Sequence, residues 1–253
     1  MADRLIVFKI GSSTLVDDAG ALDRPFIRSL CDQVASLRGA GNRGVVVSSG
    51  AAAGRDALGM TERPSDIATL QACASVGQSA LTEAYAEVLR ERGIACGQVL
   101  LTRRDVVDRE GYLNARNTIT RLLELGCVPV VNENDTVSVA EFTFGDNDML
   151  GAIVSGLVGA DLYVIMSDVD GLYTDNPSED PDAKLVPLVT EVDHKISAMA
   201  GDSSTSFGTG GMSSKVRAAR AMMAAGIPTV ICEGRRPNVL CEVASGKAIG
   251  TRF

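Results

Sequence analysis

The sequence predicts an α/β protein in which helices cover both faces of a mainly parallel β-sheet, a three-layer αβα sandwich. Segments with the spacing of amphipathic helices alternate along the chain with short apolar segments. The short segments are continuous runs of Val, Ile and Leu, which is typical of parallel strands buried on both faces. No internal repeat or long linker interrupts this pattern.

The first half of the chain begins with a buried-strand pattern that ends at Gly11, followed by a helix that stops at Gly39. The expected elements are strand 5–10, helix 25–38, strand 45–47, helix 66–91, strand 94–101, helix 112–125 and strand 127–131. The helix over 66–91 is rich in small residues, which allow close packing inside the fold or across a subunit interface.

The second half begins with residues 136–144, whose alternating pattern predicts a hairpin. The elements expected after it are helix 148–159, strand 162–166, helix 212–225 and strand 227–232. No composition change marks a domain boundary, so we expect a single domain over residues 1–253. The region from about 161 onward is expected to form its nucleotide-binding part.

Composition excludes several classes of protein. With 45% hydrophobic and 22% charged residues the chain can bury a large core, and its net charge of −8 disfavours nonspecific binding to nucleic acid or anionic membranes. The single histidine, His194, excludes a His-rich zinc site and Ser-His-Asp catalysis. There is no CxxC pair, signal-peptide pattern or apolar run of roughly 20 residues, so we expect a cytoplasmic protein with buried free thiols.

Two clusters of acidic and amide residues stand beside apolar segments. They are Asn132-Glu133-Asn134-Asp135 and Asp146-Asn147-Asp148. Carboxylates accept hydrogen bonds from an ammonium group and amide NH2 groups donate to carboxylates, so the pair of clusters suits an amino acid. Either cluster alone is better explained as a turn, or as a cap for the helix that follows, whereas the two together favour an amino-acid site.

Two lysine-containing segments predict anion sites. Lys9 lies inside an apolar strand and is followed by Gly11 and two serines, which favours a phosphate partner over a lysine that merely reaches solvent. Residues 208–215 read GTGGMSSK, in which glycine N–H groups, a helix start and Lys215 can hold a second phosphate. An ordinary glycine loop capped by Ser213 is the alternative.

Neither loop is a standard nucleotide fingerprint. GxGxxG fails at Ser213, and a Walker A loop fails because Lys215 follows Ser214. The polar residues follow four strands, however, and the carboxyl ends of parallel strands meet at one edge of a sheet. Two lysines without a histidine fit phosphoryl transfer to a carboxylate, which is already ionised and needs no general base.

Taken together, these segments resemble the amino acid kinase family, and in particular its glutamate 5-kinase branch. The resemblance covers almost the whole chain in order. It is carried by Lys9-Ile10-Gly11-Ser12-Ser13, Val47-Ser48-Ser49-Gly50-Ala51, residues 98–103, Asp108-Arg109, residues 112–118 (YLNARNT), Asn132-Glu133-Asn134-Asp135, Gly145-Asp146-Asn147-Asp148 and residues 208–215. The YLNARNT and NEND segments are specific to the branch, whereas the lysine-glycine and Gly-Gly-Met segments are shared more widely.

The resemblance implies ATP-dependent phosphorylation of the γ-carboxylate of L-glutamate to L-glutamyl 5-phosphate, the first step of proline biosynthesis. Lys9 and Lys215 would neutralise charge on the transferring phosphoryl group, and Asp148 would orient them. Glutamate is expected at Ser49, Gly50, Asp135 and Asn147. ATP is expected at Lys9, Gly11, Ser167, Asp168, Thr209, Gly210, Gly211, Met212, Ser213, Ser214 and Lys215.

The resemblance also implies Mg²⁺ with ATP, without indicating a protein ligand for the metal. Further expectations are feedback inhibition by proline, a homo-oligomer (dimer or tetramer) and coupling to a glutamyl phosphate reductase. Many family members carry a C-terminal PUA domain, which we do not expect here because the sequence stops about where the kinase domain would. Ser167 stands where the family has threonine, so a hydroxyl is retained.

Two alternatives remain open at this point. The first is another kinase of the same family, acting on aspartate, acetylglutamate, carbamate or UMP; an acidic pocket at Asp135 and Asn147 argues against UMP. The second is a non-catalytic amino-acid sensor. Lys9 and Lys215 argue against a sensor, because a sensor needs no second phosphate lysine.

Overall fold

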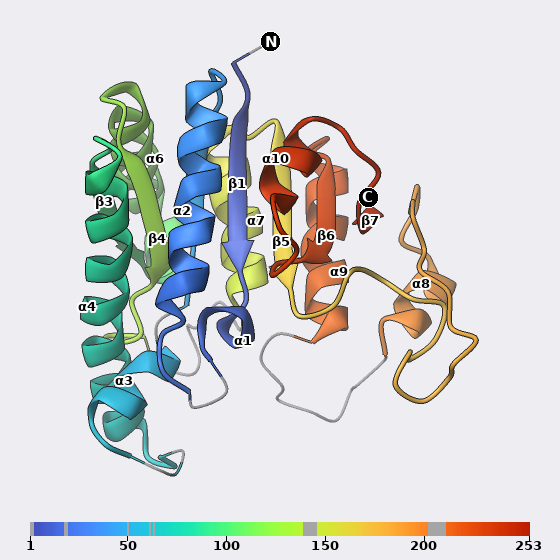
Figure 1. The fold of residues 1–253 in the computed structure, drawn as a ribbon, viewed down its shortest axis with the longest axis horizontal. Helices are drawn as coiled ribbons and strands as arrows, with labels where there is room; N and C mark the ends of the chain where they lie inside the picture. Colours follow the sequence, from blue (N-terminus) through green and yellow to red (C-terminus); the bar gives the residue numbers. More distant parts are fainter. Residues whose placement is uncertain are drawn as a thin grey trace.

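The computed structural model describes residues 3–17, 20–49, 51–60, 62, 64–138, 146–201 and 211–253. These residues contain a seven-stranded sheet with the order β3-β4-β2-β1-β5-β6-β7 (Figure 1). All neighbouring strands are parallel except β6 and β7. The strands are β1 (Leu5–Ile10), β2 (Arg43–Val47), β3 (Cys96–Leu101), β4 (Val128–Glu133), β5 (Leu162–Ser167), β6 (Thr229–Glu233) and β7 (Thr251–Arg252). The predicted α/β class is therefore confirmed.

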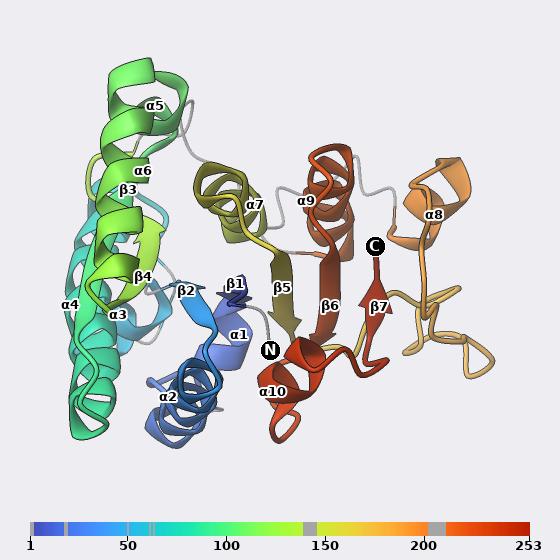
Figure 2. The same ribbon diagram turned by 90° about the horizontal axis from the view of Figure 1, so that it is seen from above.

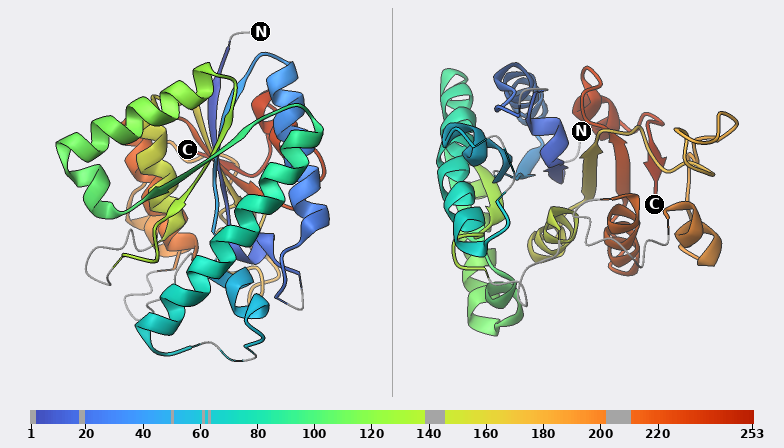
Figure 3. Two further views of the ribbon diagram at one scale, coloured as in Figure 1. Left: turned by 90° about the vertical axis from the view of Figure 1, so that its left-hand side faces the viewer. Right: turned by 90° about the horizontal axis from the view of Figure 1, so that it is seen from below.

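Helices cover both faces of the sheet, as Figure 2 shows. One face carries α2 (Arg24–Gly39), α4 (Ile67–Glu91) and α10 (Val239–Ala244), and the other carries α6 (Arg109–Glu124), α7 (Asn147–Val158) and α9 (Met212–Ala224). The shorter helices are α1 (Ser12–Leu15), α3 (Ala51–Ala57), α5 (Arg103–Val107) and α8 (His194–Met199). Figure 3 shows α4 and α6 on either side of the twisted sheet near β3.

The core consists of two clusters, one on each face of the sheet. Successive side chains of a strand point to opposite faces, so Val7 of β1 joins the cluster under α6, α7 and α9, whereas Phe8 joins the cluster under α2, α4 and α10. Burial on both faces explains why β1, β4 and β5 are continuous apolar runs in the sequence.

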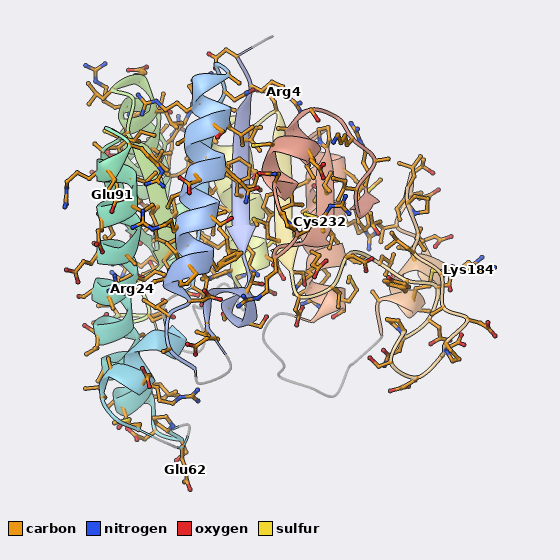
Figure 4. All side chains as sticks on the ribbon, viewed as in Figure 1. Arg4, Arg24, Glu62, Glu91, Lys184 and Cys232 are labelled. Atoms are coloured by element: carbon orange, nitrogen blue, oxygen red, sulfur yellow. The ribbon has the colours of Figure 1, made fainter. Side chains whose placement is uncertain are left out.

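Ion pairs add little to this packing. Arg24 of α2 lies 3.1 Å from Glu87 of α4, and Arg28 lies 2.5 Å from Glu91, but all four side chains are about half exposed. Figure 4 labels Arg24 on α2 and Glu91 on α4. Exposed pairs of this kind contribute little to stability, because water and salt screen their charges. All six cysteines are free, as predicted, but the predicted burial is confirmed only for Cys31, Cys73 and Cys232; the other three are half-buried.

Several predicted boundaries differ from the structure by one to three residues, and two of the differences lie near the carboxyl end of β4. The strand expected to end at Val131 continues through Asn132 and Glu133, which pair with Leu100 and Leu101 of β3, because a β-ladder joins backbone groups whatever the side chains are. The hairpin expected over 136–144 begins as a turn, in which the N–H of Ser138 donates to the carbonyl of Asn134. Residues 139–145 lie outside the described residues.

The sequence analysis did not predict α1, α3, α5, α8, α10 or β7. Helices this short are marginal by themselves and depend on caps and on neighbouring elements. Helix α5, for example, has a capping box in which Thr102 and Asp105 bond each other's backbone N–H. In the part of the chain that the structure describes, no helix has the length and apolar character needed to cross a membrane.

Candidate functional site

The carboxyl ends of β1, β2, β4 and β5 lie at one edge of the sheet, beside α1 and α3 (Figure 1). Helices α7 and α9, adjacent on one face, begin at the same edge. In open parallel sheets this edge, where neighbouring connections run in opposite directions, is where ligands bind. The predicted convergence of polar residues at this edge is confirmed.

A carboxylate between two ammonium groups forms the centre of the site. Asp148 lies in the first turn of α7; its Oδ1 is 2.5 Å from the Nζ of Lys9 and its Oδ2 is 3.2 Å from the Nζ of Lys215. The hydroxyl of Ser214 also donates to Oδ2, at 2.7 Å. Asp148 is fully buried and both lysines are 4% exposed. The structure thus brings together the three residues expected to be catalytic.

The charges in this cluster depend on one another. Burial alone would raise the pKa of Asp148, but the charges of Lys9 and Lys215 and the hydrogen bonds from Lys9 and Ser214 outweigh it and hold the pKa below its ordinary value. Burial lowers the pKa of Lys9 by more than the attraction of Asp148 raises it. With two cations around one anion, the cluster offers positive charge to an anionic ligand.

The start of α7 fixes the position of Asp148. The carboxylate of Asp146 accepts from the N–H of Met149 at 2.9 Å, so Asp146 is the helix cap that the sequence left as an alternative. From the neighbouring strand β5, the hydroxyl of Tyr163 donates to the backbone carbonyl of Asp148 at 2.7 Å. A Cβ on Gly151 would lie 2.3 Å from that hydroxyl, so glycine is required there.

The second residue of the predicted amino-acid cluster, Asn147, lies beside the end of β2. Its Nδ2 donates to the carbonyl of Ser48 at 2.6 Å and to Oδ1 of Asn132 at 2.9 Å. Ser49 follows Ser48 and is half-buried. Gly50, also expected to bind glutamate, lies outside the described residues.

Asp135 lies in the turn that follows β4 and is half-buried. Burial and the nearby carboxylate of Glu133 raise the pKa of Asp135 to about 6. Glu133 is itself buried and accepts from the hydroxyl of Ser138 at 3.0 Å. Two neighbouring carboxylates in a partly buried position favour a cationic partner such as an ammonium group.

The residues expected to bind ATP come from the ends of β1 and β5 and from the start of α9. The N–H of Gly11 donates to the carbonyl of Met166, and the hydroxyl of Ser167 donates to the exposed carboxylate of Asp168 at 2.9 Å. Gly211 is the N-cap of α9, with Met212 and Ser213 half-buried in its first turn. Thr209 and Gly210 lie outside the described residues.

The donor set bears on the expected Mg²⁺. Over the described residues, no group of three or more His, Cys, Asp and Glu side chains can hold a metal ion. The carboxylate of Asp148 has lysine partners on both oxygens. These residues fit a Mg²⁺ ion that arrives on the nucleotide phosphates and keeps several waters, rather than one held by a protein cage.

The sequence analysis missed three residues whose side chains hydrogen-bond to site residues directly or through one another: Tyr163, Gln78 and Thr82. Tyr163 reads in the sequence as an ordinary core residue of β5. Gln78 and Thr82 are polar positions in the small-residue helix α4, spaced four apart and therefore on one face of it. That spacing was the available signal, but only the fold shows that the face is directed at Asn132.

Comparison with known proteins identifies the class. Residues 4–233 match the amino acid kinase family, and the chain belongs to this family. The crystal structure of UMP kinase from Ureaplasma parvum has a TM-score of 0.67 at 15% identity and covers all of both chains. An isopentenyl phosphate kinase has a TM-score of 0.69 at 20% identity over 98% of this chain and 99% of its own. These two likenesses establish the fold alone.

Curated relatives with higher sequence identity than these two structures are named glutamate 5-kinase. The glutamate 5-kinase of Pelobacter propionicus is 48% identical over 98% of this chain, and that of Geobacter sulfurreducens is 45% identical over the same share. The glutamate 5-kinase of Chromobacterium violaceum is 46% identical over 100% of the chain. The chain spans about two thirds of these relatives, 67%, 67% and 68% of their lengths respectively.

Proposed function

We propose that this protein transfers the γ-phosphoryl group of ATP to the γ-carboxylate of L-glutamate and forms L-glutamyl 5-phosphate, the first step of proline biosynthesis. The observation that carries the proposal is the buried cluster of Lys9, Asp148 and Lys215, adjacent to Asn147. The names of the relatives supply glutamate as the substrate and a kinase reaction, which implies ATP as the co-substrate. Nothing in the site favours UMP or a sensor role.

The residues account for the chemistry without a general base. A γ-carboxylate oxygen of glutamate attacks the γ-phosphorus of ATP, the new P–O bond forms, and the bond to the β,γ-bridging oxygen breaks to release ADP. No proton moves, because the carboxylate is already ionised at neutral pH. Lys9 and Lys215 lower the repulsion between the anionic reactants and stabilise the charge that shifts to the leaving oxygen.

The ligands divide between the two halves of the sheet in this proposal. Glutamate binds to Ser49, Gly50, Asp135 and Asn147, at the ends of β2 and β4 and the start of α7. ATP binds on the β5 side, at Gly11, Ser167, Asp168 and the residues from Thr209 to Lys215. The region from about 161 onward would accordingly be the nucleotide-binding part of one domain.

Four further features of the proposal stand on family resemblance, and a fifth, the cytoplasmic location, stands on the sequence pattern. Mg²⁺ would enter with ATP and neutralise phosphate charge. Proline would inhibit at or near the glutamate site, and the protein would act as a homo-oligomer in the cytoplasm. Because an acyl phosphate is labile, a reductase that consumes it would be coupled to the enzyme. Gel filtration and proline inhibition curves test the oligomer and the feedback directly.

ADP release from MgATP tests the acceptor. L-glutamate, L-aspartate, N-acetyl-L-glutamate, carbamate and UMP are supplied in parallel, each with and without EDTA in excess over Mg²⁺. We expect ADP release with glutamate alone among the acceptors, abolished by EDTA and restored by added Mg²⁺. ADP release with a different acceptor would keep the family and reject the substrate.

A further inference from the structure

A chain of side-chain hydrogen bonds connects Asn147 to helix α4. Its bonds run from Asn147 Nδ2 to Asn132 Oδ1 (2.9 Å), from Asn132 Nδ2 to Gln78 Oε1 (2.7 Å), from Gln78 Nε2 to Thr82 Oγ1 (3.1 Å) and from Gln98 Nε2 to Thr82 Oγ1 (2.9 Å). Asn132 is 2% and Gln78 is 9% exposed. This series of hydrogen bonds therefore crosses from the outer strand β3 through the interior to the glutamate side of the site.

The end of the chain on α4 has a fixed polarity. The hydroxyl of Thr82 donates its only hydrogen to the backbone carbonyl of Gln78 at 2.9 Å. Its oxygen is left to accept, and it accepts from the amides of Gln78 and Gln98. Since the Gln78 amide turns its nitrogen to Thr82, it must turn its oxygen to Asn132.

The contacts at Asn147 agree with the polarity set at Thr82. A backbone carbonyl accepts only, so the contact of 2.6 Å with the carbonyl of Ser48 must be made by Nδ2 of Asn147. The second hydrogen of that nitrogen goes to Oδ1 of Asn132. Asn132 then presents its nitrogen to Gln78, which agrees with the direction set by Thr82.

Turning over one side-chain amide in this series of hydrogen bonds would cost free energy. If Gln78 turned over, two nitrogen donors would face each other at 2.7 Å in the interior, because Asn132 already presents its nitrogen there. Buried polar groups without a partner are strongly disfavoured. The orientation of Asn147 is therefore built into α4 and β4, before a substrate binds.

We propose that Gln78 and Asn132 are positioning residues that hold the amide of Asn147 with its oxygen facing the substrate. Both amide hydrogens of Asn147 are used by the protein, so the group that it offers is an acceptor. It follows that Asn147 binds the α-ammonium of the amino-acid substrate and not a carboxylate, contrary to the expectation that the amide NH2 groups bind carboxylates. This inference rests on the proposed function, because it deepens the glutamate site.

Two analogues of glutamate separate these possibilities. Glutarate lacks the α-ammonium, and 4-aminobutyrate lacks the α-carboxylate. Calorimetric Kd values of glutamate and both analogues are measured for the wild type and for Gln78→Met, which keeps the length of the side chain and removes its amide. We expect about a 10-fold weaker binding of glutamate and 4-aminobutyrate to Gln78→Met, with the Kd of glutarate unchanged within twofold. The selectivity for an ammonium group then falls about 10-fold.

Three other variants separate positioning from general damage. Thr82→Val should shift the Kd values in the same direction as Gln78→Met, and Thr82→Ser should restore them, because serine keeps the hydroxyl. Gln33→Met removes an equally buried amide, 6% exposed, which accepts from the N–H of Leu240 far from the site. It should leave all three Kd values unchanged. The KM for ATP should stay within twofold in every variant.

The outcomes are distinct. If Gln78→Met weakens the binding of all three ligands equally, or weakens only that of glutarate and glutamate, the proposed orientation of Asn147 is wrong. If the Kd values of Thr82→Ser match those of Thr82→Val, the Thr82 hydroxyl does not set the orientation of Asn147. Failure of the proposed function shows differently, as a wild type that neither binds nor phosphorylates glutamate while the protein remains folded.

Discussion

Asp148 has a positive partner on each carboxylate oxygen, and this arrangement makes its charge indispensable. In Asp148→Asn two buried ammonium groups would face each other without an anion between them. We expect kcat to fall about 100- to 1000-fold. The free energy of unfolding should drop by about 3–5 kcal/mol, because one partner of a buried charge cluster is missing.

The matched control for Asp148→Asn is Ser155→Ala in the same helix. Ser155 is fully buried, and its hydroxyl donates to the carbonyl of Gly151 at 2.7 Å, away from the charge cluster. Urea unfolding and ADP release are measured on both variants. An Asp148→Asn enzyme with wild-type kcat would refute the part of this carboxylate in orienting the lysines.

Asp135 gives the glutamate affinity a pH dependence. Its pKa is raised to about 6 by burial and by the charge of Glu133, and only its ionised form attracts the substrate ammonium. We expect the KM for glutamate to rise about 10-fold per pH unit below pH 6, since each unit lowers the ionised fraction about 10-fold. The KM for ATP should change far less.

Asp135→Ala and Asp135→Asn provide the comparison at this residue. Either variant should raise the KM for glutamate much more than that for ATP and should remove the acid limb of the pH profile. A profile that keeps its acid limb in the variants would assign that limb to another group.

The stability contribution of Asp135 has the opposite sign from that of a salt-bridged aspartate. Its pKa is higher in the folded than in the unfolded chain, so between about pH 6 and pH 4 folding takes up a proton. This residue therefore favours the folded state as the pH falls through that range and disfavours it above. The penalty at neutral pH is consistent with a carboxylate kept for ligand binding rather than for stability.

Among the secondary-structure elements, α7 links core packing most directly to the site. Gly151 lets the helix approach Tyr163, whose hydroxyl holds the carbonyl of Asp148. Gly151→Ala should lower the free energy of unfolding by about 1–3 kcal/mol through overpacking, and should lower kcat by moving Asp148. Gly156→Ala, in the same helix with nothing within 4 Å of the new Cβ, should stabilise by about 0.5–1 kcal/mol.

Urea unfolding and ADP release on these two glycine variants test the link. Equal stability of Gly151→Ala and Gly156→Ala would show that the close contact with Tyr163 is relieved at no cost. A destabilised Gly151→Ala with unchanged kcat would separate the packing of α7 from the position of Asp148.

The long elements could be predicted from sequence, because each is fixed by local periodicity. Helix α4 was expected over 66–91 and spans Ile67–Glu91 with Asp66 as its cap; α7 and α9 agree equally well. The short elements α3, α5, α8 and α10 depend on contacts with distant segments, so local patterns do not reveal them. For the same reason β4 continues two residues beyond its apolar run.

The candidate site could be predicted residue by residue but not atom by atom. Lys9, Asp148 and Lys215 were expected to meet because the family resemblance assigns them to one cluster, and the structure brings them together. The donor-to-acceptor direction of the side-chain hydrogen bonds through Gln78 could not be predicted, because it depends on which groups the fold brings within 3 Å. The supporting residue Tyr163 was hidden for the same reason.

For the molecule as a whole, charge is separated between surface and interior. The chain carries a net charge of −8, yet its anionic substrates meet two lysines that are 4% exposed, near the carboxyl ends of the strands. The net negative charge disfavours nonspecific polyanion binding, whereas the two buried lysines offer positive charge to a bound anion. Selectivity for phosphate therefore comes from the fold and not from overall charge.

Trapping of the reaction product tests the central claim most directly. The protein is incubated with MgATP and L-glutamate in the presence of hydroxylamine, which converts an acyl phosphate into a hydroxamate; Lys215→Ala is run beside it. The account predicts γ-glutamyl hydroxamate in amounts equal to the ADP released, with a rate about 100- to 1000-fold lower in Lys215→Ala. ADP without hydroxamate, or hydroxamate formed equally well by Lys215→Ala, would contradict phosphoryl transfer to the γ-carboxylate at this site.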